Sequence, residues 1–200
     1  MYKAALTALL ALCAFAAFAG EPMTEAEKTA LIAHLERTSA SFEKSIEGVT
    51  DAQWSYKASP QRWSLAECSE HVVSAESFIR NLFAPSMKEP ASAEVLEGAR
   101  KEQVIEAALL DRSKKFQAPE PLVPSATKFA SPAEAIAAFR AERQKTIELA
   151  RQSGDLRSFA MAHPVGGPLD AYGWFTFLSA HTARHTLQIE EVKADANYPR

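Results

Sequence analysis

Apolar residues recur at steps of three and four along four long segments of the chain. This spacing places side chains on one face of an α-helix, and each segment opens with a residue type that caps helices. In three segments a serine or threonine is followed three residues later by glutamate, so the two side chains can satisfy backbone N–H groups left free at a helix start. The pattern predicts helices that open at Thr24, Ser64, Ser131 and Asp170 and end near Gly48, Pro85, Gly154 and Ala194.

The connections between these helices differ greatly in length. The first is a loop in which Trp54 and Trp63 are expected to pack over the end of a bundle. Residues 88–130 form a much longer connection, in which several prolines favour an extended path after a short helix predicted within residues 99–115. No segment shows the alternation expected of a strand. The sequence therefore predicts an all-α fold, one four-helix bundle over residues 24–195 with a long crossover between its second and third helices.

The first twenty residues have a different character. Lys3 precedes an apolar run over residues 4–18, and Ala17 and Ala19 are the small residues that signal peptidase requires at its cleavage site. The run is shorter than the ~20 residues that span a bilayer. We therefore expect residues 1–19 to be a cleaved signal peptide, the mature protein to be periplasmic or secreted, and no stable membrane anchor to remain.

The composition adds two constraints. With a formal net charge of −3, the chain has no basic excess that would attract phosphate backbones, so no nucleic-acid partner is expected. Cleavage of the signal peptide would leave Cys68 as the single thiol. A lone cysteine cannot form an internal disulfide, so stability has to come from helix packing.

Two histidines of the last predicted helix share one face. His181 and His185 lie four residues apart, and steps of three, four and four from Leu178 reach His181, His185 and Ile189. Both imidazoles therefore point toward the core. A buried imidazole carries a donor and an acceptor that both need partners. The pair must either find hydrogen-bond partners in the core or share a metal ion.

A third histidine faces inward from the second predicted helix. His71 lies between Cys68 and Val72 on the apolar stripe of that helix. One ligand from one helix and two from another is a common way for bundles to build interior metal sites. Three neutral nitrogens with an open position suit Zn²⁺ and can also hold Ni²⁺, Fe²⁺ or Mn²⁺. The alternative is that all three histidines are structural residues with hydrogen-bond partners in the core.

Two stretches of this sequence resemble motifs of the DinB-like family. WSLAECSEH at residues 63–71, with Glu76 beyond it, is similar to the second-helix motif of that family. His163-Pro164, Gly167, Trp174 and then HTARHTLQI at residues 181–189 are similar to its last-helix motif. The resemblance extends over about residues 25–192, with the motifs in the expected order.

This resemblance implies a four-helix bundle in an up-down-down-up arrangement, often dimeric, in which a histidine triad holds a divalent metal, commonly zinc or nickel. By the family pattern the ligands are His71, His181 and His185. Characterised relatives include S-transferases and isomerases in which the metal activates a low-molecular-weight thiol. Those thiols are cytoplasmic, whereas this chain is expected to be exported.

Other side chains near the triad have two interpretations each. Glu67 could act as a base or orient His71, but its capping position already accounts for it. Cys68 could be a fourth ligand or a nucleophile, although a small buried residue on a helix stripe is the commoner explanation. Arg184 and Gln188 could hold a substrate carboxylate or thiol conjugate beside the metal.

Three hypotheses about function follow. The first is a metal-dependent transferase or hydrolase that activates a thiol or water for attack on a small-molecule substrate, with a homodimer as one assembly that the resemblance leaves open. The second is an envelope protein that binds a metal or small ligand without turnover. The third is a bundle with purely structural histidines. In each of them His163 is interpreted as a turn residue and His34 as solvated.

Overall fold

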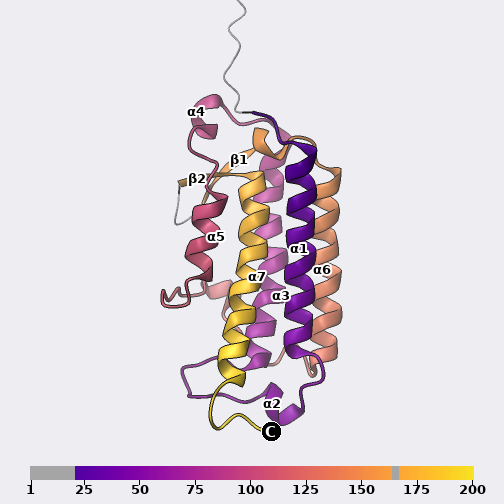
Figure 1. Ribbon diagram of the computed structural model, residues 1–200, viewed down its shortest axis with the longest axis vertical. Coiled ribbons are helices and arrows are strands. Elements are labelled where there is room, and N and C mark those ends of the chain that lie inside the picture. Colours follow the sequence, from indigo (N-terminus) through magenta and orange to yellow (C-terminus); the bar gives the residue numbers. More distant parts are fainter. Residues whose placement is uncertain (1–20, 164–166) are drawn as a thin grey trace, which may run out of the picture.

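Four long helices form the main body of the computed structural model, which describes residues 21–163 and 167–200 (Figure 1). The predicted signal peptide and part of the predicted turn before the last helix lie outside the described residues. Thr24 and Ser64 each cap a helix through a reciprocal pair of hydrogen bonds with the glutamate three residues later, as their sequence pattern predicts. The four bundle helices are α1 (Glu25–Ile46), α3 (Leu65–Phe83), α6 (Pro132–Gln152) and α7 (Ala171–Lys193).

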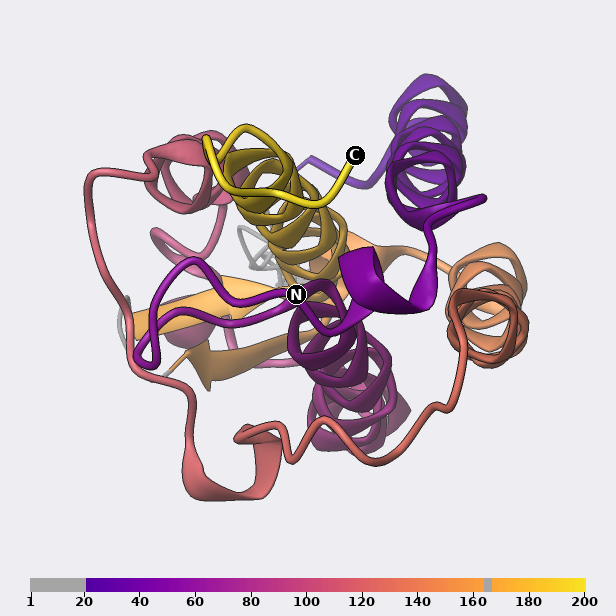
Figure 2. The ribbon, with the colours of Figure 1, turned by 90° about the horizontal axis from the view of Figure 1, so that it is seen from below.

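The helices follow the up-down-down-up arrangement that the motif resemblance implies. α1 and α7 run in one direction, and α3 and α6 run in the other (Figure 1). Viewed along the bundle, α1 packs against α6 and α7, and α3 packs against the same two helices (Figure 2). Because α3 ends and α6 begins at opposite ends of the bundle, the chain needs a connection as long as the bundle itself.

That connection is the predicted crossover, and it covers one side of the bundle. It contains the short elements η1 (Ala84–Lys88), α4 (Ala93–Leu96), α5 (Glu102–Leu110) and η2 (Glu120–Leu122). α5 lies within the stretch predicted as a short helix and packs along α7 (Figure 1). The loop between α1 and α3 likewise contains one turn of helix, α2 (Asp51–Trp54).

The prediction that the chain has no strand was wrong at one place. After α6, the turn η3 (Leu156–Ser158) leads into an antiparallel pair of strands, β1 (Ala160–His163) and β2 (Gly167–Asp170). Each strand has four residues, too few for an alternating pattern to stand out from the sequence. His163, expected in a turn, instead ends β1, where its buried ring packs against Trp174 and Phe177.

A polar layer divides the core of the bundle into two apolar clusters. The cluster near the hairpin contains Phe83 and Trp174, and the cluster at the other end contains Phe42 and Phe139. Between them every bundle helix contributes a buried polar side chain. Arg143 of α6 donates to a carboxylate oxygen of Glu76 at 2.9 Å and to the Thr182 hydroxyl at 2.7 Å. The members of this layer are Thr38, Glu76, Arg143, Ser179 and Thr182.

Candidate metal centre

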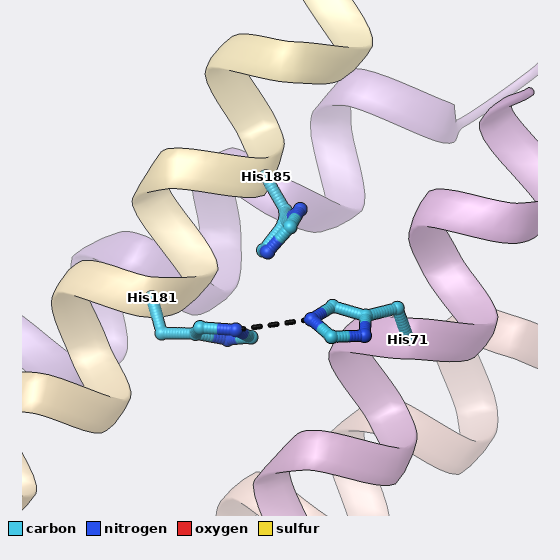
Figure 3. A group of neighbouring side chains, drawn as sticks. All are labelled: His71, His181 and His185. Atoms are coloured by element: carbon cyan, nitrogen blue, oxygen red, sulfur yellow. Dashed lines mark hydrogen bonds between the residues drawn. The ribbon is translucent and has the colours of Figure 1, made fainter. Parts of the chain in front are cut away.

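The three histidines expected to bind metal meet between α3 and α7. His71 projects from α3 toward His181 and His185 on the facing side of α7 (Figure 3). The Nε2 atoms of His71 and His181 are 3.1 Å apart, and one ligand nitrogen from each of the three rings lies within 4.8 Å of the others. Two nitrogens bound to one tetrahedral zinc ion would be ~3.3 Å apart, given Zn–N bonds of about 2.0–2.1 Å. The rings are therefore close enough to share a single ion.

Hydrogen bonds to the outer nitrogens fix the orientation of two of the rings. Nδ1 of His71 lies 2.8 Å from the carbonyl oxygen of Leu122, and since a carbonyl can only accept, Nδ1 carries the proton. Nε2 of His71 then keeps its lone pair for the cluster. Nδ1 of His185 lies 3.0 Å from the amide oxygen of Gln188, which favours the same tautomer. One ring nitrogen of His185 points into the space between the other two rings (Figure 3).

The surroundings of the triad keep the imidazoles neutral. Burial lowers the pKa of His71. Burial also lowers the pKa of His181 and of His185 well below the ordinary value, and repulsion between the neighbouring imidazoles lowers both further. Metal ligation requires deprotonated ligands. These histidines therefore present nitrogen lone pairs at neutral pH without first having to lose a proton.

Trp63 covers the triad on one side, a contact that sequence reasoning missed. Its indole lies 4.9 Å from the ring of His71 and stacks on the ring of His185 at 5.9 Å, centroid to centroid. Trp54 does pack into the end of the bundle as expected. The available signal for Trp63 was its position directly before the cap of the helix that carries His71.

Access to the triad is restricted. His71 and His185 are buried, whereas His181 is partly exposed. Open grooves in the described part of the chain lie along α6 and between α1 and α6, away from the histidines. A small molecule would therefore reach the triad from the side of His181, where Phe177 lies 6.1 Å from its ring.

Comparison with known proteins agrees with this architecture. A sequence model of the DinB superfamily matches residues 34–189. The chain belongs to the DinB superfamily. The uncharacterized protein YuaE of Bacillus subtilis (strain 168) is 26% identical over 149 residues, which cover 74% of this chain and 88% of YuaE.

A solved structure has a similar four-helix bundle fold. YfiT from Bacillus subtilis, described as a probable metal-dependent hydrolase with an unusual four-helix bundle topology, superimposes with a TM-score of 0.56. The two chains are 14% identical, and the match covers 87% of this chain and 90% of YfiT. At this identity the comparison establishes the fold, while the histidine geometry has to be argued from this chain alone.

Glu67, the candidate base, is engaged at the start of α3. One carboxylate oxygen accepts a hydrogen bond from the backbone N–H of Ser64 at 2.7 Å, and the other pairs with Nζ of Lys57 at 2.7 Å. These contacts are the capping role that its position predicts. To act as a base at the triad, Glu67 would have to give up contacts that stabilise the helix start.

The two candidate substrate-binding residues also have partners within the fold. The guanidinium of Arg184 donates to the carbonyl oxygens of Leu109, Asp111 and Lys114, just where α5 ends. Arg184 therefore fixes the crossover to α7, and a substrate would compete with backbone carbonyls for its donors. Gln188 orients His185, so it acts on the triad through a ligand.

Burial and contacts also decide how Cys68 and His34 are interpreted. Cys68 is fully buried, and burial raises the pKa of its thiol, so it stays protonated at neutral pH. The ligand group found among the described residues consists of the three histidines without Cys68. The expectation that His34 is solvated was wrong, because its Nε2 lies 3.4 Å from a carboxylate oxygen of Glu106 on α5.

Proposed function

We propose that this protein binds one divalent transition-metal ion through His71, His181 and His185 and hydrolyses a small-molecule substrate. The observation that carries the proposal is the convergence of three neutral imidazoles from two helices, with ligand atoms within 4.8 Å of one another. An all-nitrogen donor set of this kind suits zinc or nickel, and also iron or manganese. The description of YfiT, which shares the fold, as a probable metal-dependent hydrolase supports the reaction class.

The residues around the triad supply what such a site needs. His71, His181 and His185 would hold the divalent ion, which would supply Lewis acidity of the kind that lowers the pKa of water from 15.7 to about 7. Leu122 and Gln188 hold two of the rings in orientation through Nδ1. Trp63 shields the rings from solvent on one side, so a substrate would approach beside His181.

A thiol is the alternative attacking group. The resemblance of the α3 and α7 motifs to those of thiol-dependent family members supports it, and such chemistry would make the protein an S-transferase. The sequence of residues 1–19 supports a further proposal, that the protein is exported from the cytoplasm. Cytoplasmic thiols would then be absent from its compartment, which favours water as the attacking group. Among residues 21–163 and 167–200, no helix has the length and apolar character needed to cross a bilayer.

Metal analysis of protein purified without an affinity tag tests the metal site. We expect about one equivalent of a transition metal in the wild type and in His34→Ala, a control at a histidine outside the triad, and almost none in His181→Ala. Less than roughly 0.2 equivalents in the wild type, with melting unchanged by a chelator, would reject the metal centre.

Activity assays then separate a hydrolase from a transferase and from a binding protein. The loaded wild type, His34→Ala and His181→Ala would be compared on ester and amide hydrolysis and on conjugation of a low-molecular-weight thiol. Hydrolysis that disappears only in His181→Ala supports the proposal. Thiol conjugation with the same dependence would establish the alternative reaction. Equal rates in all three proteins would exclude catalysis of these reactions by the triad.

A further inference from the structure

A short segment of the crossover lies against the metal-binding face of α3. Residues 122–128, here called the strap, begin at the last residue of η2 and lead toward α6. At its first residue the carbonyl of Leu122 accepts the hydrogen bond from Nδ1 of His71. At its last residue Nζ of Lys128 donates to the hydroxyl of Ser74, at 2.9 Å. The strap therefore determines where the hydrogen-bond partner of a candidate metal ligand sits.

Glu70, the residue before His71, binds the middle of the strap. Its carboxylate accepts hydrogen bonds from the backbone N–H of Ser125 at 3.1 Å and from the Ser125 hydroxyl at 3.0 Å. The side chain is buried, and burial raises its pKa, but hydrogen bonds, those from the backbone N–H and the hydroxyl of Ser125 first, lower the pKa overall. Glu70 therefore ties α3 to the strap through the backbone N–H and the hydroxyl of Ser125.

The strap needs such an anchor because its backbone conformation is unfavourable. Ala126 has a φ of 60°, in the left-handed region that residues with a Cβ rarely adopt. No other non-glycine residue among those described has a positive φ. A segment with this conformation persists when surrounding contacts hold it. The hydrogen bonds from Ser125 to Glu70 hold the strap before Ala126, and the hydrogen bond from Lys128 to Ser74 holds it after Ala126.

We propose that Glu70 is a positioning residue for the metal centre, which holds the strap so that the Leu122 carbonyl stays bonded to Nδ1 of His71. Glu70 is not among the three residues whose ligand atoms converge at the candidate metal centre. It acts through the strap on the tautomer and orientation of one ligand, the kind of indirect support on which metal affinity depends. The inference rests on the proposed metal-binding function and adds a specific residue to it.

The test measures Co²⁺ affinity and the visible absorption of the Co²⁺-loaded protein, with Co²⁺ alone as the probe. Glu70→Ala should weaken Co²⁺ binding by up to about 10- to 100-fold, the loss typical when a ligand's own hydrogen-bond partner is removed, and should alter the absorption bands. Glu70→Gln keeps an acceptor oxygen and should fall between wild type and Glu70→Ala. Glu36→Ala removes an exposed carboxylate paired with Arg151 and should leave Co²⁺ affinity unchanged.

A second substitution distinguishes positioning from general stability. Glycine adopts the left-handed conformation without the steric cost of a Cβ. Ala126→Gly in the Glu70→Ala background should therefore recover at least several-fold in Co²⁺ affinity. In the metal-free proteins, backbone amides of residues 125–128 should exchange hydrogen faster in Glu70→Ala than in wild type.

The outcomes separate this inference from the proposed function. If wild type binds one Co²⁺ and Glu70→Ala binds it equally well with the same spectrum, the role of Glu70 is refuted and the metal centre stands. If Glu70→Ala loses affinity and stability in parallel and Ala126→Gly recovers neither, Glu70 is only structural and the inference fails. If wild type binds no Co²⁺, the metal centre and the inference fail together.

Discussion

Acidification of the metal-free protein should destabilise it through the histidine triad. In the folded protein, burial lowers the pKa of His71, and it lowers the pKa of His181 and His185 well below the ordinary value. In the unfolded chain each histidine returns to a pKa of about 6.5. The unfolded state therefore binds more protons, so the free energy of unfolding is largest above pH 6.5 and decreases as the pH falls below it.

The size of the effect follows from the number of histidines that stay neutral. A histidine that remains unprotonated when folded costs about 1.4 kcal/mol of stability at pH 5.5 and almost nothing at pH 8, for an unfolded pKa of 6.5. His181 and His185 together should remove about 2.8 kcal/mol, and His71 can raise the contribution of the triad to about 4 kcal/mol. Burial also lowers the pKa of His34 and of His163, and their contribution is the same in the wild type and in His181→Leu. Against a typical total of about 5–15 kcal/mol, such a loss is large.

Urea unfolding in the presence of a chelator measures this loss directly. The free energy of unfolding would be determined at pH 8 and pH 5.5 for the wild type and for His181→Leu. The variant should lose about 1.4 kcal/mol less than the wild type, because one titrating group is gone. Carboxylates contribute little in this interval because in the unfolded chain they titrate near pH 4. A wild-type loss below about 1 kcal/mol, or an equal loss in both proteins, would refute the assignment of neutral buried imidazoles.

Three other predictions test the surroundings of the triad. Glu76→Leu leaves the guanidinium of Arg143 buried without its partner at 2.9 Å, so urea unfolding should show a loss of about 3–5 kcal/mol, and a loss below about 1 kcal/mol would contradict a buried ion pair. The Cys68 thiol is buried with a raised pKa, so a thiol reagent should modify it in denaturant but only slowly in native buffer; fast native modification would show that it is accessible. Co²⁺ should quench the fluorescence of Trp63, and Trp63→Phe should remove most of the quenching while Trp54 and Trp174 still emit; unchanged quenching would place the ion elsewhere.

The bundle helices could be predicted because their signals are local. The start of α3, for example, is set by the hydrogen bonds between Ser64 and Glu67, residues three apart in the chain. The facing of His181 and His185 follows from helical spacing within α7 in the same way. That these two meet His71 required the helix order, which the resemblance of two motifs to the DinB-like family supplied.

The parts that could not be predicted depend on contacts between distant segments. The hydrogen-bond partner of His71 is the backbone carbonyl of Leu122, 51 residues away. Every residue has such a carbonyl, so the sequence does not indicate which one lies beside His71. Which carbonyl lies beside Nδ1 of His71 depends on the path of the crossover between α3 and α6. Trp63 was assigned to packing because an indole before a helix cap has no specific chemistry of its own. The signal peptide over residues 1–19 stays a prediction.

The polar layer gives a physical reason why His71 of α3 lies level with His181 and His185 of α7 along the bundle axis. Buried ion pairs such as Arg143–Glu76 add little net stability, because desolvation offsets their attraction, but they can fix the register of packed helices. Glu76 lies on α3 and Thr182 on α7, and both bind Arg143, so α3 and α7 have one relative height at which these contacts form. A shift of α7 by one turn would move its side chains by about 5.4 Å along the bundle, far more than a shared ion could bridge. The Arg143 contacts and the 3.1 Å separation between the Nε2 atoms of His71 and His181 therefore belong to the same register of α3 and α7.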